Sequence, residues 1–68
     1  MVILIDHEEN KKKIRQWFKH NKLPSPGVIN FIGDWAHGYC YAVTTGLIHL
    51  KHFCVYFKDD EIFDVKER

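Results

Sequence analysis

The segment from Asp6 to Pro24 carries both a start signal and a stop signal for one amphipathic helix, and it constrains the fold more than any other feature. The Asp6 carboxylate can accept hydrogen bonds from the free amides of a first helical turn, and Glu9 follows in a capping-box-like position. Pro24 cannot continue a helix because it has no amide hydrogen. Apolar side chains recur at helical spacing between the two signals, at Ile14, Trp17 and Phe18. The sequence therefore predicts a helix with one buried face.

The segments on either side of this helix indicate a strand before it and a connector after it. Residues 2–5 are uniformly apolar and rich in β-branched side chains, which favours a short strand buried on both faces. Residues 23–27 are a connector, in which the Pro26-Gly27 pair suits the central positions of a type II turn. The chain is thus expected to reach the helix from a strand and to leave it through a turn.

The composition after residue 27 favours strands. Residues 28–32 and 39–45 are rich in β-branched and aromatic side chains. The residues between them have turn chemistry, at Gly33-Asp34 and His37-Gly38. This combination predicts a hairpin.

A second hairpin is predicted across residues 53–65, where apolar side chains alternate with polar ones on either side of a polar turn at 58–61. Residues 47–57 are ambiguous, because their periodicity fits two structures. A helical face is shared by Leu47, Leu50, Cys54 and Phe57. The aromatic and β-branched content of 52–57 favours a strand, and a helix remains the alternative.

Taken together, these elements predict an α+β fold in which one amphipathic helix packs on a small, mainly antiparallel sheet, in the order β-α-β-β-β, with one further strand at the end as the alternative. A chain of 68 residues is too short to bury two separate cores, so residues 1–68 are expected to form a single compact domain. A hydrophobic content of 46% and a charged content of 28% are typical of a globular protein and exclude a disordered chain.

The cysteine content and the N-terminal residues indicate a cytoplasmic protein. Cys40 and Cys54 are the only two cysteines, whereas secreted domains of this size are usually rich in disulfides. The apolar run at the N-terminus is too short for a signal sequence or a membrane span. Free buried thiols, no cofactor and no membrane partner are expected.

The predicted architecture leaves one face of the sheet without a helix, and this face is expected to bind another protein or a second copy of the chain as a homodimer. Alternation places Tyr39, Tyr41 and Val43 on one face and Cys40, Ala42 and Thr44 on the other. If the small side chains lie under the helix, the tyrosines point outward. The expected interface anchors are therefore aromatic: Trp35, Tyr39, Tyr41 and Tyr56.

Nucleic acid is the alternative partner, because the helix carries an exposed basic face. Lys12, Arg15 and Lys19 lie on this face and could meet phosphates, while exposed tyrosines could stack on unpaired bases. The formal net charge is only +1, which argues against a strong general attraction to polyanions. A solvated helix face is therefore the favoured interpretation.

A small zinc-binding domain is the second alternative. The spacing of His37, Cys40, His49 and His52 offers four side chains of the types that bind tetrahedral zinc. The spacing lacks the paired cysteines of a zinc knuckle, so no metal site is favoured. The sequence also lacks a glycine-rich phosphate loop and the motifs of hydrolases and metalloproteases, and no enzymatic activity is expected.

Overall fold

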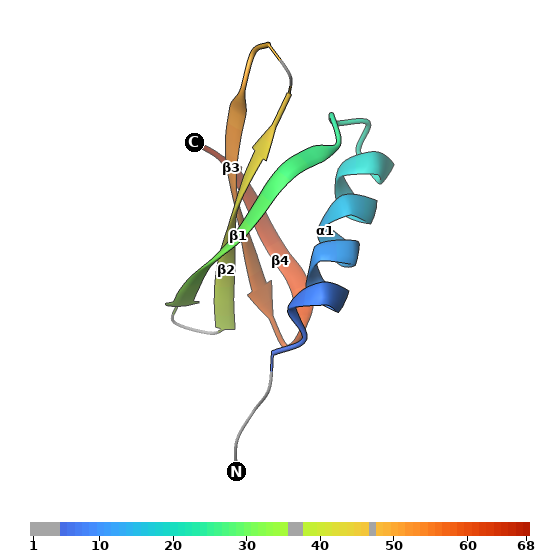
Figure 1. Ribbon diagram of the computed structural model, residues 1–68. Coiled ribbons are helices and arrows are strands. Elements are labelled where there is room, and N and C mark those ends of the chain that lie inside the picture. The colour runs from blue at the N-terminus through green and yellow to red at the C-terminus, as the bar shows by residue number, and fades with distance from the viewer. Residues whose placement is uncertain (1–4, 36–37, 47) are drawn as a thin grey trace.

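The computed structural model describes residues 5–35, 38–46 and 48–68, in which one helix lies against a four-stranded antiparallel sheet (Figure 1). The sheet is a meander, in which each strand pairs with its neighbours in the chain in the order β1-β2-β3-β4. The elements are α1 (His7–His20), β1 (Pro26–Trp35), β2 (Gly38–Thr45), β3 (Lys51–Lys58) and β4 (Glu61–Glu67).

The predicted helix is confirmed, together with its start signal. The Asp6 carboxylate accepts a hydrogen bond of 3.1 Å from the amide of Glu9, which caps the N-terminus of α1. Ile14 and Phe18 are fully buried against the sheet. The helix ends at His20, and Lys22 then takes a left-handed backbone with φ of 59°. Within the described residues α1 is the only helix, and it is too short and too polar to cross a membrane.

The strands after the helix are also confirmed, and the ambiguous region is resolved in favour of a strand. β3 spans Lys51–Lys58, so the second half of residues 47–57 is extended rather than helical. β1 already begins at Pro26, inside the predicted connector 23–27. Gly33 and Asp34 do not form the hairpin turn but lie within β1, next to a register shift between Phe31 and Gly33.

The predicted order β-α-β-β-β differs from the described order, which is α-β-β-β-β. Residues 2–4 of the predicted first strand lie outside the described residues, and Ile5 is not in a strand. The half-buried Ile5 side chain instead packs beside the core. Apolar content alone does not distinguish a residue in a buried strand from one that packs beside a core outside any strand, as Ile5 does.

The expectation that Tyr39 and Tyr41 point outward is wrong. Both side chains lie under α1, where Tyr41 is fully buried and Tyr39 is 9% exposed. The large rings fill the space between the helix and the sheet, and Tyr39 stacks on Phe57 at 5.4 Å between ring centroids. This packing supplies the large buried area that a chain of this size needs. The small side chains occupy the opposite face: Cys40, Ala42 and Thr44.

The strand directions give the molecule two different ends along its long axis, in an envelope of 43 × 19 × 16 Å. The N-terminus of α1, the end of β1 and the β3–β4 turn lie together at one end (Figure 1). The C-terminus of α1 and the β2–β3 hairpin lie at the other, and the hairpin projects beyond the rest of the fold. We refer to this second end, formed by residues 19–25, 46 and 48–52, as the hairpin end.

Candidate functional site

The sheet face that α1 does not cover is the main candidate for a functional surface, and we call it the open face. Cross-strand pairs define it: Cys40 lies opposite Tyr56, Ala42 opposite Cys54, and Thr44 opposite His52. Tyr56 pairs in turn with Asp64, and Cys54 with Lys66. The open face therefore has a floor of small side chains, with larger aromatic and charged side chains beside it.

Three aromatic side chains from three strands meet on the open face, and we call them the aromatic cluster. Trp35 lies at the end of β1, Tyr56 in β3 and Phe63 in β4. The ring centroids of Trp35 and Tyr56 are 5.2 Å apart, and those of Trp35 and Phe63 are 5.5 Å apart. The indole nitrogen of Trp35 also donates a hydrogen bond of 3.1 Å to the Phe57 carbonyl, which fixes the ring across the sheet.

A β-bulge explains why Phe63 belongs to this cluster. Tyr56 pairs with Asp64 and Phe57 pairs with Ile62, so the register shifts at Phe63. Simple alternation would place Phe63 on the same face as Val65, which packs against the core under α1. The bulge re-aims Phe63 toward Trp35, where its side chain is 57% exposed.

Two lysines bring positive charge to the aromatic cluster. The ammonium of Lys58 lies 5.6 Å from the ring centroid of Phe63, and that of Lys66 lies 5.8 Å from the centroid of Tyr56. These distances fall within the range of cation–π contacts. A hollow of about 260 Å³ opens beside the rings, lined by Trp35, Tyr56, Phe63, Asp64 and Lys66. The site can therefore receive an apolar group, with the paired charges of Lys66 and Asp64 at its rim and Lys58 beside Phe63.

Of the aromatic anchors predicted from the sequence, the structure brings together Trp35 and Tyr56 and separates them from Tyr39 and Tyr41. The sequence prediction missed Phe63, because a bulge has no clear signal in a single sequence and period-two alternation assigns the residue to the wrong face.

A polar network lies beneath the opposite face, between α1 and the sheet. The Asn10 side-chain amide donates hydrogen bonds of 3.1 Å to the hydroxyls of both Tyr39 and Tyr41. The Tyr41 hydroxyl lies 2.7 Å from Nδ1 of His7, and the Tyr39 hydroxyl donates to Asp60 at 2.7 Å. Burial raises the pKa of Tyr41, so its phenol resists ionisation. The network holds the helix on the sheet.

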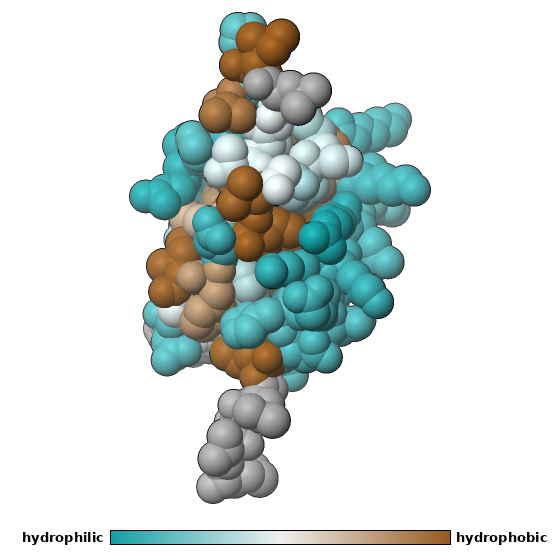
Figure 2. All heavy atoms as spheres, in the orientation of Figure 1, coloured by the Kyte–Doolittle hydropathy of each residue, from teal (hydrophilic) through white to brown (hydrophobic). Residues whose placement is uncertain are grey.

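The basic residues considered for nucleic-acid binding are all exposed on α1. Lys12, Arg15 and Lys19 are solvent-facing, and Figure 2 shows hydrophilic side chains over the outer surface of the helix. Nearby, Lys13 donates a hydrogen bond of 2.6 Å to the Asp60 carbonyl, which ties the helix to the β3–β4 turn. None of the aromatic cluster lies on this surface, so the helix and the stacking rings are on different sides of the sheet.

The side chains considered for zinc are spread over the fold. Cys40 and His52 lie on the open face, whereas His49 lies in the β2–β3 hairpin and His37 is outside the described residues. Across residues 5–35, 38–46 and 48–68, no three His, Cys, Asp or Glu side chains form a group that could hold a metal ion. Burial raises the pKa of the Cys40 thiol, and the neighbouring Cys54 adds to the shift. Both cysteines are free and buried.

Comparisons of this chain with protein-family models, with curated proteins and with solved structures find no match.

Proposed function

We propose that this chain is a small intracellular binding module that docks a protein partner on its open face, with the aromatic cluster as the anchor. The observation that carries the proposal is the position of Phe63, which is 57% exposed beside Trp35 and Tyr56 on a sheet face without a helix. Tryptophan and tyrosine side chains dominate the binding energy of many protein interfaces. Binding rather than catalysis is proposed, because burial raises the pKa values of Tyr39, Cys40 and Tyr41, so these groups keep their protons and are poor nucleophiles.

The chemistry of the open face indicates what the partner must present. The hollow beside the cluster, about 260 Å³, suits one apolar or aromatic side chain rather than a large ligand. Lys66 lines the hollow and Lys58 lies against Phe63, and Asp64, whose carboxylate is 4.0 Å from Lys66, offsets only part of this positive charge. The remaining positive charge favours a carboxylate beside the bound side chain. The small floor residues Ala42 and Cys54 let a partner backbone approach the sheet closely. A protein segment with an apolar anchor and acidic neighbours fits these features.

Affinity capture with matched variants tests this proposal. Phe63→Ser removes the exposed ring, and Lys66→Glu reverses the charge beside it. Ile48→Ser is the control, because it removes an even more exposed apolar side chain from the distant hairpin end. We expect the wild type and Ile48→Ser to capture the same proteins from a nuclease-treated cytosolic extract, and both open-face variants to lose them.

Other outcomes contradict the proposal in distinct ways. Capture by Phe63→Ser equal to that of the wild type would remove the open face from consideration. Capture that nuclease abolishes, and that is lost in Lys12→Glu, would assign function to the basic helix and a nucleic acid. A homodimer in sedimentation equilibrium that Phe63→Ser dissociates would make a second copy the partner.

A further inference from the structure

The β2–β3 hairpin ends in exposed aliphatic side chains. Ile48 is 87% exposed and Leu50 is 57% exposed, although turns usually carry polar side chains at such positions. Figure 2 shows hydrophobic side chains at the outermost point of this hairpin. Single exposed apolar residues are common, but two on a projecting hairpin form a surface that water solvates poorly.

The α1–β1 connector extends this apolar surface. A hollow of about 590 Å³ lies between the connector and the hairpin, and it is lined by Pro24, Ser25, Gly27, Gly46, Ile48 and His49. Gly46 has φ of 96°, a left-handed conformation that glycine adopts without strain, and it starts the turn of the hairpin. Two loops from different parts of the chain thus present one continuous surface at the hairpin end.

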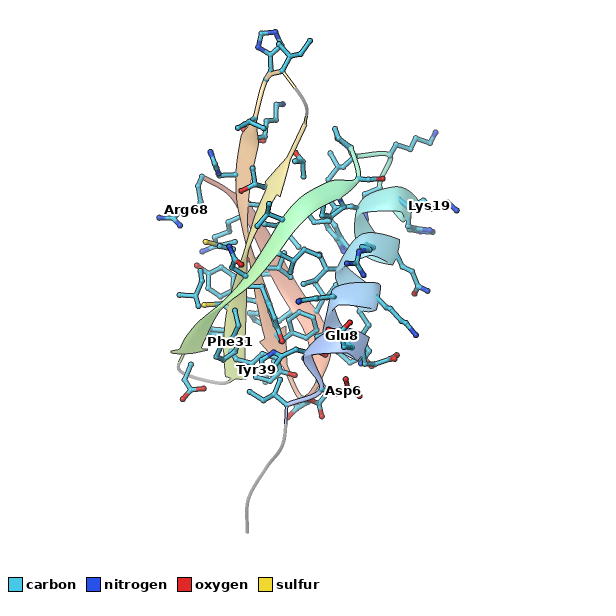
Figure 3. The ribbon with its side chains drawn as sticks, in the orientation of Figure 1. Asp6, Glu8, Lys19, Phe31, Tyr39 and Arg68 are labelled. Atoms are coloured by element: carbon cyan, nitrogen blue, oxygen red, sulfur yellow. The ribbon has the colours of Figure 1, made fainter. Side chains whose placement is uncertain are left out.

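The charges of the molecule are segregated along its long axis. Residues 10–33 and 35–58 contain no Asp or Glu, and these ranges include both loops of the hairpin end. The cationic side chains there are Lys19, Lys22 and Lys51, with His20, His49 and His52 beside them. Figure 3 shows Asp6 and Glu8 toward the opposite end of the fold, and Lys19 nearer the hairpin end.

Most of the carboxylates lie at the end away from the hairpin. They belong to the first turn of α1, the end of β1 and the β3–β4 turn: Asp6, Glu8, Glu9, Asp34, Asp59, Asp60 and Glu61. Glu67, which pairs with Phe53, is the carboxylate side chain nearest the hairpin end. The overall net charge of +1 therefore conceals a basic end and an acidic end. Screening limits charge interactions to about 10 Å in ordinary buffers, so a bound surface responds to the local charge.

We infer that the hairpin end docks on the surface of an anionic phospholipid bilayer. Ile48 and Leu50 enter the headgroup region, while Lys22 and Lys51 contact lipid phosphates. A bilayer surface meets both features at once, because it dehydrates aliphatic side chains and attracts cations. A nucleic acid would leave the aliphatic side chains in water. The sequence alone predicts no membrane partner, because it has neither a spanning segment nor a high net charge. The fold brings several cationic side chains together at one end, and this local positive charge is not visible in the net charge of the chain.

This orientation leaves the other surfaces free. The acidic end points away from the anionic bilayer, which lowers the repulsion between them. The strands run along the long axis, so the aromatic cluster, at the end of β1 and the start of β4, stays at a distance from the lipid. The docking inferred here is independent of the protein partner proposed above.

Co-sedimentation with vesicles tests the inference. The full chain is mixed with vesicles of phosphatidylcholine alone, or of phosphatidylcholine with about one third phosphatidylserine. We expect binding only to the vesicles that contain phosphatidylserine, with a loss of most of it at about 0.5 M salt. Ile48→Ser should weaken binding about tenfold through the lost apolar contact. Lys51→Glu should weaken it about thirtyfold by replacing a cation with an anion.

Two control variants test whether vesicle binding occurs at the hairpin end or at another surface of the protein. Phe63→Ser removes an exposed apolar side chain from the open face, and Lys12→Glu makes the same charge change on α1 away from the hairpin; both should bind like the wild type. The inference is overturned if the wild type does not bind phosphatidylserine vesicles at low salt, or if Lys12→Glu abolishes binding and Lys51→Glu does not. Self-association without vesicles that Lys51→Glu abolishes would also overturn it, in favour of a second copy docking by its acidic end.

Discussion

Tyr39 in β2 donates a hydrogen bond of 2.7 Å to the carboxylate of Asp60 in the β3–β4 turn. Burial of the phenol and this hydrogen bond raise the pKa of Tyr39 from 10.0 to about 12. The folded protein therefore holds the phenol proton to a higher pH than the unfolded chain does. The pair joins the second strand to the last turn of the sheet and sits under the first turns of α1.

We predict that the free energy of unfolding falls between about pH 10 and pH 12 because of this group. Below that range both the folded and the unfolded states keep the phenol proton, and Tyr39 makes its full contribution to the free energy of unfolding. Above that range this contribution, about 2 kcal/mol, is lost. Asp60→Asn should reduce the loss, as measured by urea denaturation across this pH range. Asp59→Asn is the control, because Asp59 and Asp60 share a left-handed backbone, with φ of 53° and 62°, that Asn also tolerates. An identical alkaline slope in both variants would contradict the role of Asp60.

Asn10 is predicted to be the most important polar residue for stability. Its side chain is 3% exposed and donates to two tyrosine hydroxyls, so Asn10→Ala leaves both without that donor. The expected loss is about 2–3 kcal/mol in urea denaturation. Asn30→Ala, at an exposed position in β1, should change stability by less than about 0.5 kcal/mol. Equal effects of the two substitutions would show that the network contributes little.

Gly38 is predicted to tolerate no side chain. A Cβ atom there would overlap the Phe57 carbonyl oxygen, which also accepts the hydrogen bond from Trp35. Gly38→Ala should therefore cost about 2 kcal/mol or more and lower the melting temperature by about 8 °C or more. Gly27→Ala is the matched control, since its Cβ would lie 3.7 Å from the Thr44 carbonyl oxygen, an ordinary contact. That variant should melt within a few degrees of the wild type, and a reversed ranking would contradict the geometry.

Asp6 is predicted to stabilise the start of α1. Asp6→Ala removes the acceptor for the Glu9 amide and should cost about 1 kcal/mol in thermal unfolding followed by far-UV circular dichroism. Asp6→Asn keeps a side-chain oxygen in the same place and should retain most of the stability. If Asn were as destabilising as Ala, the hydrogen bond would not be the source of the effect.

The helix and the later strands could be predicted from the sequence because their signals are local. Asp6 and Pro24 bound the helix, and β-branched or aromatic side chains mark residues 28–32, 39–45 and 52–57. The side of the sheet that the helix covers could not be predicted in the same way. Alternation separates two faces of a strand, but it does not say which face is buried.

One overlooked signal would have placed the tyrosines correctly. Asn10 shares a helical face with Ile14 and Phe18, so it lies on the buried side of α1. A buried amide needs hydrogen-bond partners, and the hydroxyls of Tyr39 and Tyr41 supply them. Only part of the aromatic cluster could be predicted from the sequence. Trp35 and Tyr56 were predicted, whereas the position of Phe63 depends on a bulge that the alternation of side chains does not reveal. The charge segregation also appears only when the turns are assigned to the ends of the fold.

The meander with an N-terminal helix determines the order in which the fold can be completed. During synthesis α1 leaves the ribosome before the strands that bury its apolar face. The first hairpin, β1–β2, supplies Tyr39 and Tyr41 to the core, whereas Phe53 and Phe57 follow only with β3. The bonds from Lys13 and Tyr39 to Asp60 form only when the last turn has emerged. Nascent chains that end before β3 would therefore leave much of the apolar face of α1 exposed to chaperones.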